Sequence, residues 1–338
     1  MPLSFEPVAV VGGFTMADIN AAKTLAGANG KLFFPSGVYD IDGLTADEAD
    51  QTWVMQKGVT LLRNTASAAH GVSIPSGNSL HMIGGTLDMN RTNNSNDAYR
   101  GINSVDGDFK WSGDWHLKAC PGPGLSVHNG LLELEDGLIT DTRYMGIYWV
   151  ALSNGSDGKP RQAPKLHRVK VDRREGYGSS GGIILNGGGS AVTSHAAIVH
   201  DCEVQLPRVT TDAARANYYD AVAIEINRCY RPSVIGNISG GGRISISFAS
   251  CASPVDVGNR TYESCDYGHE HVASEWAAIS GNNSTGMFLP GESHGIILSG
   301  ACVGCSVTGN STKIGFASPV TNISTPSAYP HQFAGNVV

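Results

Sequence analysis

The sequence has few charged residues and few aromatic ones, at 16% and 7% of 338 residues, and it has no long apolar run. Its 23 basic residues against 30 acidic ones give a net charge of −7, which argues against nucleic acid as a partner, because phosphate binding requires a concentrated basic surface. Without an apolar run or a charged-then-apolar leader, we expect neither a membrane span nor a secretory signal.

Helical patterns are also scarce, and short apolar segments punctuated by Gly, Asn and Ser take their place. One unit runs from His294 to Asn310: a short apolar strand, a Gly/Ser turn, and a second short strand that ends in Gly-Asn. Looser copies of this unit precede it, at a spacing of roughly 20–35 residues, which is typical of stacked coils that bury a core only by covering one another. With 43 glycines available for the bends, the sequence predicts an all-β, single-stranded parallel β-helix, a solenoid.

The seven cysteines are odd in number and scattered through strand-like segments, which favours buried thiols over a disulfide framework. Cys302 and Cys305 form a lone CxxC without the second pair of a structural zinc site, so a stacked turn is the simpler interpretation. His269 and His271 flank Glu270 and could bind a metal ion together, but no third ligand follows at a spacing typical of a metal site. We therefore predict no metal and no cofactor.

The first 43 residues are predicted to form an N-terminal segment with a capping helix and the first strand, and residues 44–338 one continuous β-helix. Thr15 suits the N-cap of a helix, Asp18 follows three residues later, and Gly27 suits its end. A helix at this place would cover strand edges that the end of a solenoid otherwise leaves unpaired.

After this helix, residues 30–41 read GKLFFPSGVYDI, and residues 84–88 read GGTLD. This opening and the coil pattern behind it resemble the pectate-lyase-like right-handed parallel β-helix superfamily, which includes bacteriophage tailspikes and related polysaccharide depolymerases. The resemblance implies a right-handed fold, a polysaccharide or oligosaccharide substrate, and an extracellular or virion-associated location. No run of alternating Asp matches the calcium cluster of classical pectate lyases, so calcium-dependent lyase chemistry is not carried over.

The resemblance also implies a parallel homotrimer. The sequence adds outward apolar positions that a neighbouring chain would cover, at Ile184, Ile297 and the Tyr148-Trp149 pair. The alternative is a monomer in which the loop 206–217 covers this apolar column.

In a β-helix, equivalent positions of successive coils stack about 4.8 Å apart and form columns on an outer face. Aligning residues 183–186 with 224–227 places Glu225 beside Ile184. Continuing the alignment puts Tyr148 on one side, and Ser245 and His271 on the other. A carboxylate in a strand of Ala, Val and Ile is solvated, paired or used in chemistry.

Tyr, His, Arg and carboxylate residues recur at one corner of four consecutive coils, as a sugar-binding cleft requires, although a solvated polar corner would show the same residues. For a glycosidase, the predicted catalytic carboxylates are Asp220, Glu225 and Glu270. The residues expected to orient the sugar are Tyr219, Arg243, His269, His271 and His294.

Arg143, Tyr144 and Tyr177 form a second group that is expected to contact substrate, and in a trimer they would face Asp220 and Glu225 of the next chain. Arg, Tyr and an acid are also what a uronate lyase or epimerase needs to neutralise the carboxylate and abstract the C5 proton. Surface ion pairs explain them equally. The alternatives to a hydrolase are therefore a polysaccharide lyase or epimerase, and a non-catalytic glycan-binding or fibre module.

Overall fold

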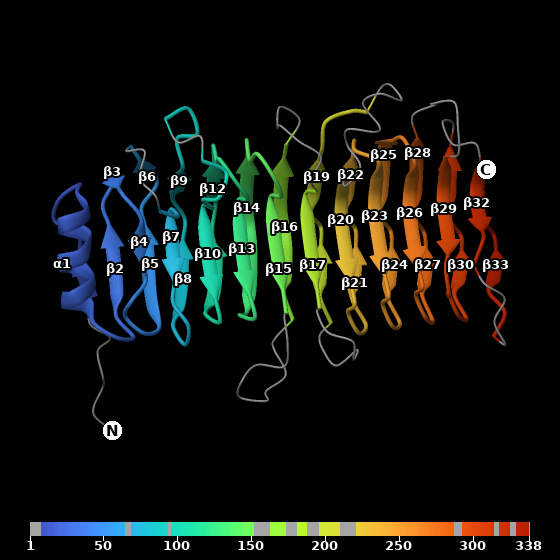
Figure 1. Ribbon diagram of the computed structural model, residues 1–338, viewed down its shortest axis with the longest axis horizontal. Helices are drawn as coiled ribbons and strands as arrows, with labels where there is room; N and C mark the ends of the chain where they lie inside the picture. Colours follow the sequence, from blue (N-terminus) through green and yellow to red (C-terminus); the bar gives the residue numbers. More distant parts are fainter. Residues whose placement is uncertain are drawn as a thin grey trace.

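The computed structural model describes residues 8–337, except 65–68, 94–95, 152–162, 174–180, 188–195, 210–220, 287–292, 314–317 and 325–328. The described chain is an elongated solenoid with α1 at one end and β32 and β33 at the other (Figure 1). The coils contribute strands to three ladders, in which neighbouring strands of the described residues pair in parallel. The predicted all-β parallel β-helix is confirmed.

The strands of the three ladders have the following bounds. The first ladder contains β1 (Val8–Val10), β2 (Lys31–Phe34), β5 (Gln51–Met55), β8 (Ser79–Ile83), β11 (Asp108–Ser112), β14 (Leu132–Thr140), β16 (Lys165–Asp172), β18 (Ile198–His200), β21 (Ser233–Ile235), β24 (Val255–Val257), β27 (Ala278–Ser280), β30 (Ser306–Thr308) and β33 (Gln332–Ala334). The second contains β3 (Gly37–Ile41), β6 (Val59–Arg63), β9 (Thr86–Asp88), β12 (Trp115–Lys118), the far halves of β14 and β16, β19 (Glu203–Gln205), β22 (Ile238–Gly240), β25 (Arg260–Ser264), β28 (Asn283–Gly286) and β31 (Ser311–Lys313). The third contains β4 (Leu44–Thr45), β7 (Val72–Ile74), β10 (Ile102–Val105), β13 (Leu125–His128), β15 (Ile147–Val150), β17 (Ile183–Asn186), β20 (Val222–Asn227), β23 (Ile244–Ala249), β26 (Tyr267–Val272), β29 (His294–Ser299) and β32 (Ser318–Asn322).

The N-terminal helix α1 (Met16–Ala26) forms where the sequence predicts it. The side chain of Thr15 accepts a hydrogen bond from the backbone N–H of Asp18, whose carboxylate accepts one from the backbone N–H of Thr15, so the two residues form a capping box. Ile19, Ala22 and Ala26 are buried against the first coils, so the helix covers the end of the core. Strands β2 and β3 of the first 43 residues hydrogen-bond to β5 and β6, and the ladders continue across residue 43.

Side chains inside the coils form two apolar clusters. The larger one extends from Ala9 to Cys251, and the smaller one from Ala277 to Val307. All seven cysteines lie within the described residues, where each is buried and none forms a disulfide. Among the described residues, no helix has the length and apolar composition that a membrane crossing requires.

The coil between the two clusters has a polar interior. Asp256 on β24 accepts hydrogen bonds from His269 Nδ1 at 2.8 Å and His271 Nε2 at 3.1 Å, and all three side chains are completely buried. Its other carboxylate oxygen accepts from Asn259 Nδ2 at 2.8 Å. Burial alone would raise the pKa of Asp256, but the contacts with His269 and then His271 hold that pKa far below its usual range.

A ladder of buried asparagines lines one turn of the later coils. In each of them, Oδ1 accepts the backbone N–H of the equivalent residue one coil earlier, at 2.8–3.0 Å, and Nδ2 donates to a backbone carbonyl. The residues are Asn237, Asn259, Asn282, Asn310 and Asn336. The ladder satisfies turn backbone groups that would otherwise be buried without a partner.

Candidate functional site

An open cleft of about 650 Å³ lies on the outer face of the third ladder. Strands β17, β20, β23 and β26 form its floor, and Met145 and Gly181 also line it. The outward side chains that line it include Ile184, Asn186, Glu225, Asn227, Arg243, Ser247, Tyr267 and Glu270.

Two carboxylates stand in one column of this floor. The column runs Tyr148, Ile184, Glu225, Ser247, Glu270 and Ile297 on successive strands. Glu225 and Glu270 are therefore two strands apart, and at about 4.8 Å per strand their Cα atoms are separated by roughly 9–10 Å.

The two carboxylates differ in environment. Burial raises the pKa of Glu270, the negative charge of Glu225 raises it further, and Ser247 Oγ, which donates to Glu270 Oε2 at 3.0 Å, opposes the shift. Glu225 Oε1 instead accepts a hydrogen bond from Asn227 Nδ2 at 2.5 Å. Burial and the neighbouring negative charge therefore favour the protonated form of Glu270 more than in an ordinary glutamate, whereas the carboxylate of Glu225 has a hydrogen-bond donor of its own.

One edge of the cleft carries a cation and an aromatic ring. Arg243 donates a hydrogen bond to Asp266 at 2.5 Å. Because Asp266 is completely buried, this contact holds the guanidinium at the edge of the cleft. Tyr267 stacks on His294 with ring centroids 5.7 Å apart and an interplanar angle of 22°. His294 Nδ1 and Thr321 Oγ1 are 2.9 Å apart, which fixes the orientation of the imidazole ring.

The cleft brings together three of the predicted site residues, Glu225, Glu270 and Arg243, and His294 lies beside Tyr267 at its edge. Tyr177, Tyr219 and Asp220 lie outside the described residues. Tyr267, Ser247 and Asn227 also line the cleft and were not among the predicted site residues, although Tyr267 lies only two residues before His269.

His269 and His271 were expected to orient the sugar, and the structure contradicts this. Both rings are completely buried, point into the core and bind Asp256. Their strand alternates, so only Glu270 between them faces the cleft. The expected neighbours of Glu225, Ser245 and His271, were likewise wrong: the register places Ser247 and then Glu270 in that column.

Arg143 and Tyr144 lie next to Met145, but neither lines the cleft. Tyr144 Oη donates to Asp97 Oδ2 at 2.7 Å, and Arg143 Nη1 lies 3.8 Å from the same oxygen. Because the cation is about two fifths exposed, this pair contributes little to stability. Contact of these two residues with substrate stays a prediction.

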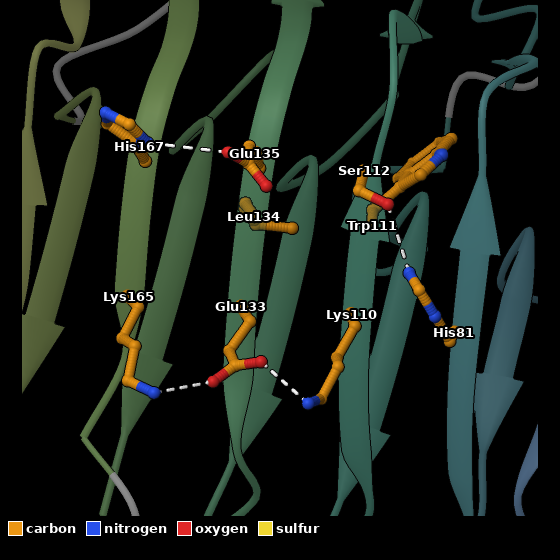
Figure 2. Close-up of a pocket in the computed structure, with 9 residues that line it drawn as sticks. All are labelled: His81, Lys110, Trp111, Ser112, Glu133, Leu134, Glu135, Lys165 and His167. Atoms are coloured by element: carbon orange, nitrogen blue, oxygen red, sulfur yellow. Dashed lines mark hydrogen bonds and ion pairs between the residues drawn. The ribbon is translucent and has the colours of Figure 1, made fainter.

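A second groove, of about 460 Å³, lies on the first ladder across β8, β11, β14 and β16. Figure 2 shows Glu133 between Lys110 and Lys165, and His81 beside Ser112. The Glu133 carboxylate lies 2.7 Å from Lys110 Nζ and 2.8 Å from Lys165 Nζ, and His81 Nε2 lies 3.0 Å from Ser112 Oγ. Its charged groups are satisfied by cross-strand partners, as on an ordinary polar sheet face. Burial would raise the pKa of Glu133, but its contacts with Lys110 and Lys165 hold that pKa below its usual range. We assign the candidate site to the cleft on the third ladder, where Glu270 has a raised pKa.

Nothing in the described part of the chain suggests a metal centre, because no group of three or more His, Cys, Asp or Glu side chains is arranged to hold an ion. The Asp256 cluster fits a metal poorly, since both imidazoles direct one nitrogen at the same carboxylate oxygen.

Solved structures with a similar fold include two that cover nearly all of this chain. The A-module of the mannuronan C-5 epimerase AlgE6 from Azotobacter vinelandii is 14% identical over 95% of this chain and 93% of its own, with a TM-score of 0.56. Tailspike protein 3 of bacteriophage CBA120 is 10% identical over 92% of this chain and 53% of its own, with a TM-score of 0.58. No family model matches the sequence, and no curated protein matches it. The comparisons establish the fold class, a right-handed parallel β-helix.

Proposed function

We propose that the protein is a polysaccharide-cleaving enzyme, a glycoside hydrolase whose acid and base are Glu270 and Glu225. The observation that carries this proposal is the pair itself: one carboxyl group with a raised pKa and one with a hydrogen-bond donor, two strands apart in an open cleft. An elongated fold with an open outer face suits a polymeric substrate, and the tailspike and epimerase names among structures of this fold are consistent with a glycan.

We infer inversion at the anomeric carbon, because Glu225 and Glu270 lie two strands apart in their column rather than on neighbouring strands about 4.8 Å apart. Inverting glycosidases hold their carboxyl groups about 6.5–9.5 Å apart, which leaves room for a water molecule, whereas retaining ones hold them about 5–5.5 Å apart. Glu270 would donate its proton to the glycosidic oxygen as the C–O bond breaks. Glu225 would accept a proton from the water whose oxygen forms the new bond to the anomeric carbon. Arg243 and Tyr267 would hold the flanking sugar.

Replacing either carboxylate by its amide tests the proposal. Glu225→Gln and Glu270→Gln should each lower the rate of polysaccharide cleavage at least 100-fold, because each removes one proton-transfer group, and the melting temperature should stay nearly unchanged. Glu263→Gln, at a carboxylate outside the cleft, is the matched control. Near-normal cleavage in both cleft variants refutes the assignment.

The runner-up is a lyase or epimerase acting on a uronate polymer, favoured by Arg243 and Tyr267 in the same cleft. Arg243 would neutralise the uronate carboxylate, and Tyr267 would abstract or return the C5 proton. A panel of neutral and uronate polysaccharides, including mannuronan, separates these functions: hydrolysis releases reducing ends, elimination also creates an unsaturated sugar that absorbs in the ultraviolet, and epimerisation leaves chain length unchanged. Saturable binding without any product would indicate a non-catalytic glycan-binding module.

A further inference from the structure

One tryptophan differs from the other four in its exposure. Trp53, Trp111, Trp115 and Trp149 are buried to within 1%, whereas Trp276, in the turn between β26 and β27, is 49% exposed. An indole ring has a large apolar area that is normally buried. At Trp276, about half of the side chain stays in water, so the free energy that its burial would contribute is not gained.

The turn explains the backbone at Trp276 but not its side chain. The equivalent turn residues of neighbouring coils, Arg231, Ser253 and Gly304, have φ of 49°, 51° and 60°, and Trp276 has φ of 55°. The left-handed region is costly for a bulky residue and is best filled by Gly or Asn. Because the adjacent coils do without an aromatic ring here, the turn geometry does not require one.

The indole ring packs against the protein on one side. A Cβ atom on Gly304 would lie 2.5 Å from atoms of the indole, so the ring lies close against this glycine in the next coil. Tyr329, which is 56% exposed, packs on it with centroids 5.0 Å apart and an interplanar angle of 58°. We call this pair the aromatic shelf. A preformed, half-exposed aromatic surface is suited to stacking against the apolar face of a sugar ring, because little conformational entropy is lost on binding.

The shelf lies close to the candidate active site. Val272 lines the cleft, and Trp276 follows it by four residues, so their Cα atoms are at most roughly 14 Å apart even if this segment is fully extended. We propose that the aromatic shelf of Trp276 and Tyr329 binds a sugar of the same polysaccharide outside the cleft, as a remote subsite. The identity of the polymer as the ligand rests on the proposed function, whereas the stacking contact is independent of Glu225 and Glu270.

Tryptophan fluorescence tests this directly, because Trp276 is the exposed indole. Oligosaccharides of six or more sugars, prepared from mannuronan, dextran and the other polysaccharides of the panel, are titrated into Glu270→Gln protein. We expect at least one to shift the emission to shorter wavelength and to protect it from acrylamide quenching. Trp276→Ala should abolish both effects and weaken binding about tenfold, a loss of about 1.4 kcal/mol, whereas Trp276→Phe should retain most of the affinity.

Phe14→Ala is the matched control, since Phe14 is 53% exposed and packs on Tyr39 at 5.1 Å and 60° at the other end of the solenoid. It should bind as the parent does. The proposal is overturned if no oligosaccharide changes the emission, or if Trp276→Ala and its parent bind equally. It is also overturned if the shift follows protein concentration without glycan, because a second copy would then cover the shelf. An emission change with no turnover in the wild type would leave the shelf intact and refute the hydrolase.

Discussion

Burial raises the pKa of Glu270, and Ser247 opposes this shift, because its hydroxyl hydrogen-bonds the charged form of that carboxyl group. Ser247→Ala removes a contact that lowers the pKa of Glu270, so this pKa should rise. If Glu270 acts as the acid, the alkaline limb of the pH–rate profile reports its pKa and should move to higher pH in the variant. Ser299→Ala, on the same ladder but outside the cleft, should leave the profile in place. An unmoved alkaline limb in Ser247→Ala would exclude Glu270 as the acid.

The buried pair of Asp256 and His271 contributes to the loss of stability in acid. Burial lowers the pKa of His271, opposed by its bond to Asp256, and the contacts with His269 and His271 hold the pKa of Asp256 down. The unfolded chain takes up a proton on His271 below about pH 6.5 and on Asp256 below about pH 4, where the folded chain does not. Both shifts therefore make the free energy of unfolding fall as the pH falls.

Asp256→Asn should lower the free energy of unfolding at pH 7.5 by about 3–5 kcal/mol, since it breaks a buried charged network, and should remove the part of the acid dependence that begins near pH 4. Urea denaturation at several pH values measures both. Asp201→Asn changes an exposed Asp–His pair and should cost less than about 1 kcal/mol. Equal stability of the two variants would contradict this account of the cluster.

The asparagine ladder shows how one turn element stabilises successive coils. Asn282→Ala removes the acceptor of the Asn259 backbone N–H and the donor to the Asp256 carbonyl, and leaves both backbone groups buried. At about 1–3 kcal/mol for each unsatisfied group, the loss in unfolding free energy should be about 2–5 kcal/mol. Asn283→Ala, at the next residue, which is half-buried, should cost far less in the same denaturation experiment. Comparable losses would show that the ladder bonds add little.

Strand pattern predicts the elements well and their inward face less well. The capping helix, the coil repeat and the pairing of Glu225 with Ile184 follow from the sequence, because apolar alternation and Gly turns are local signals. The inward orientation of His269 and His271 does not follow from the sequence, since a shift of one residue moves a side chain from the solvent to the core. An alignment that placed Ile246 and Phe248 on the inner face would have placed both histidines there too. Their partner Asp256 comes from another ladder, and local pattern carries no such information.

Assembly is a property of the whole molecule. Two of the apolar positions that were expected to support a trimer are too buried to contact another chain. Trp149 is completely buried in the core, and Ile297 is 2% exposed. A homotrimer stays a prediction, and it would sediment at three times the chain mass of 35.4 kDa. A single species at the chain mass across micromolar concentrations would exclude it, together with any active site shared between chains.

The polar coil around Asp256 also interrupts the apolar core of the solenoid. In a solenoid each coil touches only its neighbours, so the fold behaves as a row of linked units rather than as one cooperative block. The cleft strands β17, β20 and β23 pack on the apolar cluster that extends from Ala9 to Cys251. Glu270 lies on the next strand, β26, which belongs to the polar coil. Unfolding that begins at the C-terminal coils and reaches this coil would therefore displace Glu270 from Glu225 while the coils that hold the larger apolar cluster are still folded.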